Sequence, residues 1–170
     1  MTINFYCTLP ATFYSRPIAS PPPDWVEIEI GPGPIGLPEN QEYGFRIHNI
    51  DNQDLKTLVA EIAEVSPLTY INLSENRKIT DDALVYLRDF SDLVYLNLSS
   101  CSLRNNGLAY LQEIPSLETL DLSYCNRLTG RALKNLQDLP NLAALNLQGC
   151  VKITNADVVR FKKQGLVINK

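Results

Sequence analysis

The stretch LTYINLSENRKITDDALVYLRDFSD, which begins at Leu68, opens a pattern that the chain then repeats, and this repetition decides the fold. The next copies are LVYLNLSSCSLRNNGLAYLQEIPS from Leu93, LETLDLSYCNRLTGRALKNLQDLPN from Leu117 and LAALNLQGCVKITNADVVRFKKQG from Leu142. Their starts are 25, 24 and 25 residues apart. A divergent copy precedes them, with Phe45 and Ile47 as its strand, and the final LVINK is predicted to be one more short strand.

Each copy joins the spacing of a strand to the spacing of a helix. The opening L-x-x-[LI]-x-L turns apolar side chains to one face of a short strand. The second half, as in Leu84, Leu87 and Phe90, has the spacing of an amphipathic helix. One such unit cannot bury its apolar side alone, whereas stacked units share a continuous core. Because helices are wider than strands, we expect a curved α/β solenoid with a parallel concave sheet and convex helices.

Proline and leucine divide the chain at about residue 44. Eight of the eleven prolines precede this point, but only two of the 25 leucines do. Residues 1–24 are predicted to form an extended, proline-containing arm, because proline lacks a backbone donor. Residues 25–49 are predicted to form a β-hairpin cap that starts with WVEIEI, covers the first repeat and merges into it. About five leucine-rich units are then expected over residues 45–170.

Composition and charge exclude several classes of protein. The chain has 170 residues, of which 45% are hydrophobic and 20% charged, as in a single globular domain. The net charge of −4 comes from residues 1–44, while residues 45–170 carry 14 basic and 14 acidic side chains. We therefore expect no nucleic-acid partner. No apolar run approaches the roughly 20 residues that span a membrane, and the N-terminus does not resemble a secretory signal.

The copies resemble the leucine-rich repeat family and, within it, the cysteine-containing subclass. The position eight places after each leading leucine carries the resemblance to the subclass, and it holds Asn76, Cys101, Cys125 and Cys150. This subclass is familiar from the repeat domains of F-box proteins and from bacterial leucine-rich repeat proteins. The resemblance implies a right-handed α/β superhelix that binds a partner protein.

The three cysteines at this position can be interpreted in two ways. Zinc sites use closely spaced cysteine pairs with supporting histidines, and this chain has neither such a pair nor more than one histidine. The favoured interpretation is a column of small buried thiols that donate to the backbone of the turn after each strand. We thus expect no metal and no cofactor. Free thiols also favour a reducing compartment, so the predicted location is the cytoplasm.

The outward positions of the strands are the candidate binding surface. Tyr70 and Tyr95 should lie side by side there, and tyrosine next to amides is common where proteins recognise proteins. The predicted partner-binding residues are Arg46, His48, Tyr70, Asn72, Tyr95, Asn97, Thr119, Asp121 and Asn146. A second interpretation applies to the asparagine and aspartate positions, which could form a ladder that only supports neighbouring strands.

The sequence favours a non-enzymatic interaction module that binds a partner protein on its concave face. His48 is the only histidine and has no nucleophile motif beside it, so no catalytic residue is predicted. The alternative is a structural or scaffold subunit that assembles through its ends and its N-terminal arm. The chain is expected to be monomeric or to self-associate weakly through its open C-terminal end.

Overall fold

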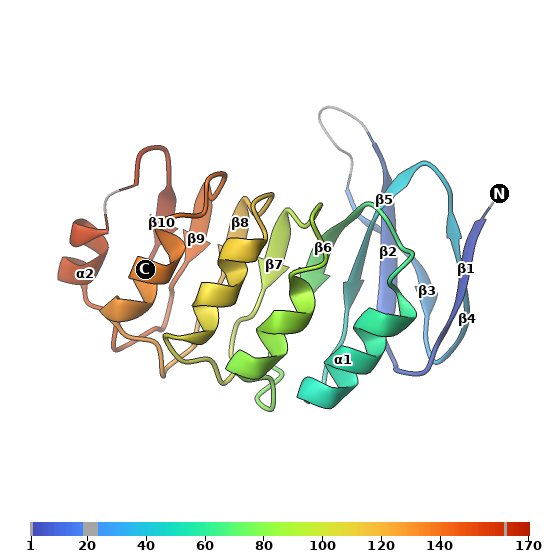
Figure 1. Ribbon diagram of the computed structural model, residues 1–170, viewed down its shortest axis with the longest axis horizontal. Coiled ribbons are helices and arrows are strands. Elements are labelled where there is room, and N and C mark those ends of the chain that lie inside the picture. The colour runs from blue at the N-terminus through green and yellow to red at the C-terminus, as the bar shows by residue number, and fades with distance from the viewer. Residues whose placement is uncertain (1, 19–23, 162) are drawn as a thin grey trace.

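Strands contributed by the repeats form a parallel sheet, in which each repeat adds one strand beside the last (Figure 1). The computed structural model describes residues 2–18, 24–161 and 163–170. The parallel strands are β5 (Gln41–Arg46), β6 (Leu68–Asn72), β7 (Tyr95–Asn97), β8 (Thr119–Asp121), β9 (Ala144–Asn146) and β10 (Val167–Asn169). The predicted inward positions are all buried, from Leu68 to Leu147. The strand half of each repeat is therefore confirmed.

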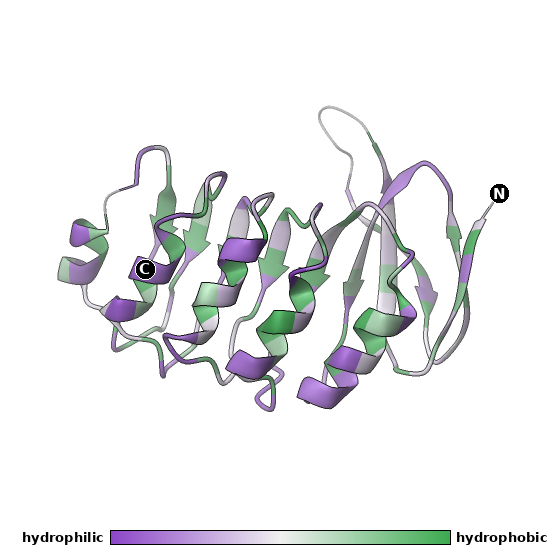
Figure 2. Ribbon diagram, in the orientation of Figure 1, coloured by the Kyte–Doolittle hydropathy of each residue, from purple (hydrophilic) through white to green (hydrophobic). Residues whose placement is uncertain are grey.

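Helices cover one face of this sheet, and the opposite face is open (Figure 1). They are α1 (Asn52–Glu61), η1 (Asp81–Leu87), η2 (Gly107–Glu113), η3 (Gly130–Leu136) and α2 (Asn155–Arg160). The three η elements are 3₁₀ helices, whose greater rise per residue spans the length of a strand with only seven residues. Each buries two leucines against the sheet, such as Leu84 and Leu87 in η1. Hydrophobic and hydrophilic residues accordingly alternate along these elements (Figure 2).

The N-terminal part of the chain forms further strands, and here the predictions were wrong. These strands are β1 (Thr2–Cys7), β2 (Thr12–Pro17), β3 (Val26–Ile30) and β4 (Gly33–Pro38). The predicted arm therefore contains β1 and β2, while the prolines at 21–23 lie outside the described residues. The predicted hairpin does not form either, because β2 inserts between β3 and β5 and pairs antiparallel with both. β1 pairs with β4 in a separate two-stranded sheet.

Residues 2–17 form strands and not an extended arm because aromatic side chains of this segment pack into the core. Phe13 is 1% exposed, and its ring lies 5.3 Å from that of Phe5 and 6.5 Å from that of Phe45. The segment WVEIEI, predicted to cover the first repeat, instead leaves Val26 57% exposed at the edge of the sheet. The first repeat is thus closed by β2, with Phe13 in the role that the prediction gave to β3.

The predicted column of thiols is confirmed. Cys101, Cys125 and Cys150 are buried, and each Sγ donates to a main-chain carbonyl of the preceding unit at 3.0–3.2 Å. Burial raises the pKa of Cys101 to about 12, and burial is also the main cause of the raised pKa of Cys125 and Cys150. These thiols therefore stay protonated at neutral pH and act as structural donors.

Candidate functional site

The open face of the sheet carries a row of tyrosines at its N-terminal half. Tyr70 and Tyr95 are paired neighbours in the sheet, and their rings stack with centroids 5.0 Å apart and planes inclined by 18°. Tyr14 of β2 joins the row, because Gly44 stands between it and Tyr70 in the sheet. A Cβ on Gly44 would lie 2.6 Å from Cδ1 of Tyr70, so only glycine fits there. The rings of Tyr14 and Tyr70 then meet edge to face at 6.2 Å.

A tryptophan completes this aromatic cluster, which we define as Tyr14, Trp25, Tyr70 and Tyr95. The ring of Trp25 lies 5.4 Å from that of Tyr70. The guanidinium of Arg16 lies 4.4 Å above the Trp25 ring and forms an ion pair with Glu42 at 2.7 Å. The cluster is therefore held in place by a stacked cation and by packing between rings.

Sequence reasoning missed half of the aromatic cluster. Tyr14 and Trp25 were assigned to the arm and the predicted hairpin, so neither was placed on the binding face. One signal could have found Tyr14: the alternation of Ala11, Phe13 and Ser15 with more polar residues has the period of a strand with one buried face. In contrast, the stacking of Tyr70 on Tyr95 was predicted and is confirmed.

Beside the aromatic cluster, the open face is hollowed. A hollow of about 350 Å³ lies between the N-terminal strands and the repeats, and Arg16, Trp25, Tyr70, Tyr95 and Thr119 contribute to its lining. A smaller hollow of about 140 Å³ shares Tyr95 and Thr119 and continues to Ala144 and Val167. Ala144 and Val167 hold the same strand position as Tyr70 and Tyr95. Their side chains are shorter than tyrosine, so they leave this space open.

Burial disfavours the charged form of two tyrosines of the cluster. It raises the pKa of Tyr95, with smaller contributions from Tyr70 and from the charge of Asp121. It also raises the pKa of Tyr14, and the carboxylate of Glu27 adds to the effect. At neutral pH both phenols can therefore donate a hydrogen bond to a ligand.

A second row on the same face consists of asparagine and aspartate residues, whose side chains form hydrogen bonds with the nearby backbone. Asn72, Asn97, Asp121 and Asn146 each accept from the backbone N–H two residues further on, at 2.8–3.1 Å. Asn146 Nδ2 also donates to Asp121 Oδ2 at 2.9 Å. These contacts support the interpretation of this row as a ladder that fixes the strand ends.

Arg46 and His48 lie next to this row and bond to each other. Arg46 pairs with Asn72 in the sheet, and its Nε donates to His48 Nε2 at 2.6 Å. His48 Nδ1 lies 3.1 Å from the carbonyl oxygen of Ser74, within hydrogen-bond distance. Because both ring nitrogens are occupied, His48 is positioned as a structural link between the first two repeats.

Two kinds of feature are absent from the described part of the chain. Residues 2–18, 24–161 and 163–170 contain no group of three or more His, Cys, Asp or Glu side chains placed to hold a metal ion. Within the same ranges, no helix has the length and apolar character required to cross a membrane.

Comparison with protein families defines the class of this chain. The family described as "Leucine Rich repeat" matches residues 66–87, which run from before β6 to the end of η1, and residues 113–136, which run from the end of η2 to the end of η3. Together with the regular stack of strand and helix, these matches show that the chain contains leucine-rich repeats, as the sequence predicted.

Among solved structures, a chain of the "Crystal structure of Rad7 and Elc1 complex in yeast" is similar to this one. The TM-score is 0.62 at 21% identity, and the match covers 72% of this chain and 31% of that chain. This likeness supports the α/β repeat fold, over less than a third of the yeast chain's length. No curated protein sequence matches this chain.

Proposed function

We propose that this protein is a non-enzymatic interaction module that binds a partner protein on the open face of its sheet. The observation that carries the proposal is the aromatic cluster, in which four rings from β2, the β3 entrance, β6 and β7 gather beside a hollow. Tyrosine and tryptophan dominate the energetics of many protein interfaces. The similar yeast structure is itself a complex of two proteins, Rad7 and Elc1.

The packing of the cluster favours binding without a large ordering cost. Tyr70 packs against three other rings, and its side chain lies over Gly44, where any Cβ would clash with it. A surface that is already ordered loses little conformational entropy when a partner docks. The partner should therefore place an apolar or aromatic side chain in the hollow at Tyr95 and Thr119, and accept a hydrogen bond from a tyrosine hydroxyl.

The test is affinity capture from a lysate of the source organism with the double variant Tyr70→Glu/Tyr95→Glu. Its matched control is Tyr110→Glu/Tyr124→Glu, which places the same charges at exposed tyrosines outside the aromatic cluster. Circular dichroism must show that both variants are folded. We expect the partner to be lost with the first variant and kept with the control. Equal recovery with both variants would remove the open face as the binding surface.

Of the alternative function as a scaffold subunit, only assembly through the two ends of the stack is still proposed. Its N-terminal arm is not free, because β1 and β2 are packed into the N-terminal strands. Assembly through the edge strands β3 and β10 remains open to test by sedimentation at several protein concentrations. We also retain the cytoplasm as the proposed location, since the four cysteines are free and a reducing compartment maintains free thiols.

A further inference from the structure

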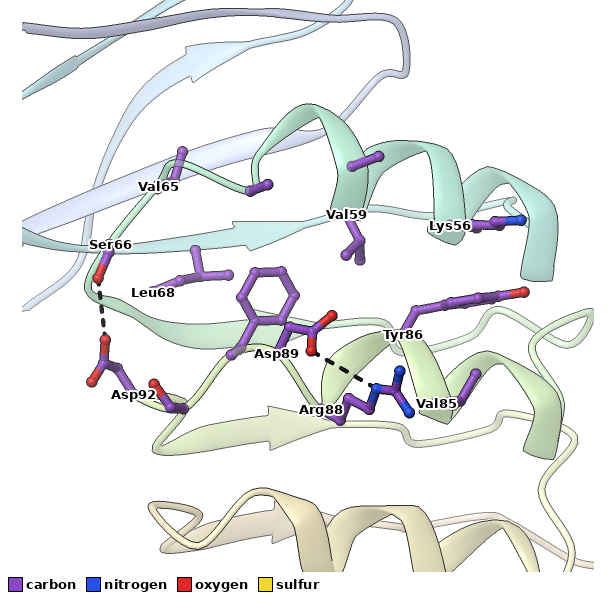
Figure 3. A pocket seen from close by; sticks show the side chains of 14 residues that line it. Lys56, Val59, Val65, Ser66, Leu68, Val85, Tyr86, Arg88, Asp89 and Asp92 are labelled. Atoms are coloured by element: carbon purple, nitrogen blue, oxygen red, sulfur yellow. Dashed lines mark hydrogen bonds and ion pairs between the residues drawn. The ribbon is translucent and has the colours of Figure 1, made fainter.

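A second hollow lies on the helix-covered side of the molecule, between α1 and η1 (Figure 3). Its volume is about 490 Å³, within the range of small-molecule sites. Val59, Ala60 and Ala63 line it from the first unit, and Val85, Tyr86 and Phe90 line it from the second. None of these residues belongs to the aromatic cluster, so this hollow is separate from the proposed protein-binding face.

One residue that lines the hollow, Ala63, is smaller than its equivalents in the later units. In each unit the residue in question stands five places before the leading leucine of the next unit, such as Leu68 or Leu93. The later units place Arg88, Gln112 and Gln137 there, whereas the first unit places Ala63. Gln112 shows what the long side chain does, because its Nε2 reaches the carbonyl of Asn135 in the next helix at 3.1 Å. Ala63 leaves the equivalent space empty.

Hydrogen bonds join the two units on both sides of the hollow. Near the start of the helices, Asn52 Nδ2 donates to Thr80 Oγ1 at 2.7 Å. Beyond their ends, Ser66 Oγ donates to Asp92 Oδ2 at 3.2 Å, as Figure 3 shows. The hollow is therefore bounded along its length, which suits a compact ligand better than a continuous helix or strand.

Two cations, Lys56 and Arg88, and two carboxylates, Asp89 and Asp92, line the hollow. Arg88 pairs with Asp89 at 3.8 Å, and Asp92 accepts from Ser66. Lys56 makes no ion pair or hydrogen bond with the described residues; its Nζ lies 6.0 Å from the centroid of the Tyr86 ring. Figure 3 shows Lys56 and Tyr86 together at the end of the hollow opposite Ser66 and Asp92. The end of the hollow at Lys56 is thus positive and lies beside apolar walls, whereas Asp92 makes the opposite end negative.

We propose that this hollow binds a small amphipathic anion, with an apolar body between Val59 and Phe90 and its acidic group at Lys56. The apolar body buries against side chains that the repeat otherwise leaves half-buried, such as Val59, Val85 and Tyr86. The acidic group gains a cation at the rim, and Tyr86 offers an aromatic surface next to it. A short-chain fatty acid or an aromatic acid has this chemistry.

The test uses two fluorescent probes of similar shape, anilinonaphthalene sulfonate, which is an anion, and the neutral N-phenylnaphthylamine. Ala63→Gln gives the first unit the residue that two later units already have, and it should weaken both probes by about tenfold or more because it fills the space. Ala63→Ser is the matched control and should leave both affinities unchanged. Ala60→Leu fills the same hollow from the preceding helical turn and should act like Ala63→Gln.

The charge is tested separately with Lys56→Gln, with Lys152→Gln as the control at an exposed lysine elsewhere. Lys56→Gln should weaken the anionic probe by about three- to tenfold and leave the neutral probe unchanged. Decanoate should displace the anionic probe from the native protein. The proposal is overturned if neither probe binds, if both filling variants bind as tightly as the native protein, or if Lys56→Gln affects the two probes equally. These outcomes are independent of the partner-capture experiment on the open face.

Discussion

The residue eight places after each leading leucine shows how one side chain serves the backbone of its unit. In three units it is a cysteine that donates to a carbonyl of the unit before. Asn76 holds this position in the first complete repeat and is buried. Its Nδ2 donates to the carbonyls of Ile47 and Leu73 at 2.8 and 3.0 Å, while its Oδ1 accepts from the N–H of Ile50 at 2.9 Å. The asparagine side chain thus provides an acceptor for the buried N–H of Ile50 as well as donors for the carbonyls. The cysteines of the other units provide a donor to a carbonyl.

This difference predicts that Asn76→Cys is destabilising, although it installs the residue of the other units. The buried N–H of Ile50 would lose its acceptor, and an unsatisfied buried donor costs about 1–3 kcal/mol. Urea unfolding followed by circular dichroism measures the free energy of unfolding. Cys101→Ser is the control, since the hydroxyl keeps a donor for the carbonyl of Leu73 and should cost less. Equal stability of Asn76→Cys and the native protein would contradict the assigned role.

The raised thiol pKa values predict how stability depends on pH. In the unfolded chain these cysteines ionise near their ordinary pKa of 9.0, while the folded protein keeps them protonated, with the pKa of Cys101 raised to about 12. A group whose folded pKa is raised stabilises the fold fully below its unfolded pKa and progressively less above it. The free energy of unfolding should therefore fall as the pH rises above 9.0. A variant with Cys101, Cys125 and Cys150 replaced by serine should lose this part of the decline.

At the scale of elements, the N-terminal strands decide both the end of the core and half of the aromatic cluster. β2 lies between β3 and β5, so one of its faces supplies Phe13 to the core and the other supplies Tyr14 to the open face. The same strand thus closes the stack of repeats and extends the candidate binding surface. An open stack would otherwise expose the apolar side of its first unit.

Phe13→Ala should therefore behave as a core substitution. We expect a loss of about 3–5 kcal/mol in the free energy of unfolding, because a buried aromatic side chain leaves a cavity among Phe5 and Phe45. Tyr6→Ala in β1 is the matched control, since Tyr6 is 63% exposed and should change stability by less than about 0.5 kcal/mol. Chemical denaturation measures both. If Phe13→Ala were as mild as the control, β2 would not be part of the folded core.

At the scale of the whole molecule, a single hydrophobic core runs through the N-terminal strands and all the repeats. It includes Phe13 near one end, Leu120 in the middle and Phe161 near the other. Each unit contacts its neighbours, so the stability of one unit depends on the units beside it. The open face and the hollow between α1 and η1 are consequently presented by one continuous scaffold.

This continuity predicts that a substitution in the middle of the stack unfolds both ends together. Leu120→Ala should lower the free energy of unfolding by about 2–5 kcal/mol. Fluorescence of Trp25, the only tryptophan, reports on the N-terminal strands, and far-UV circular dichroism reports on the whole chain. Both signals should shift to the same lower urea concentration. A Trp25 transition that stays in place while the dichroism shifts would show that the N-terminal strands fold independently.

The candidate site was predictable where it depends on the repeat. Register in a parallel stack places equivalent positions side by side, so the stacking of Tyr70 on Tyr95 and the row of Asn72, Asn97 and Asp121 followed from spacing. The contributions of Tyr14 and Trp25 did not, because no repeat relates them to the tyrosines. The hollow at Ala63 also required the structure, since a short side chain becomes a cavity only when the neighbouring helix does not move in to fill it.

The sequence by itself determined the leucine-rich repeat class, the alternation of strand and helix, the buried leucines and the thiol column. All of these depend on contacts between equivalent residues of adjacent units, which a period of about 25 residues makes visible in the chain. Only the tertiary structure decided that β2 separates β3 from β5 and that Phe13 closes the core. The pairing of strands that do not repeat depends on which sheet edges and which buried spaces the rest of the fold leaves free. These are contacts between distant parts of the chain, and the spacing of neighbouring residues does not predict them.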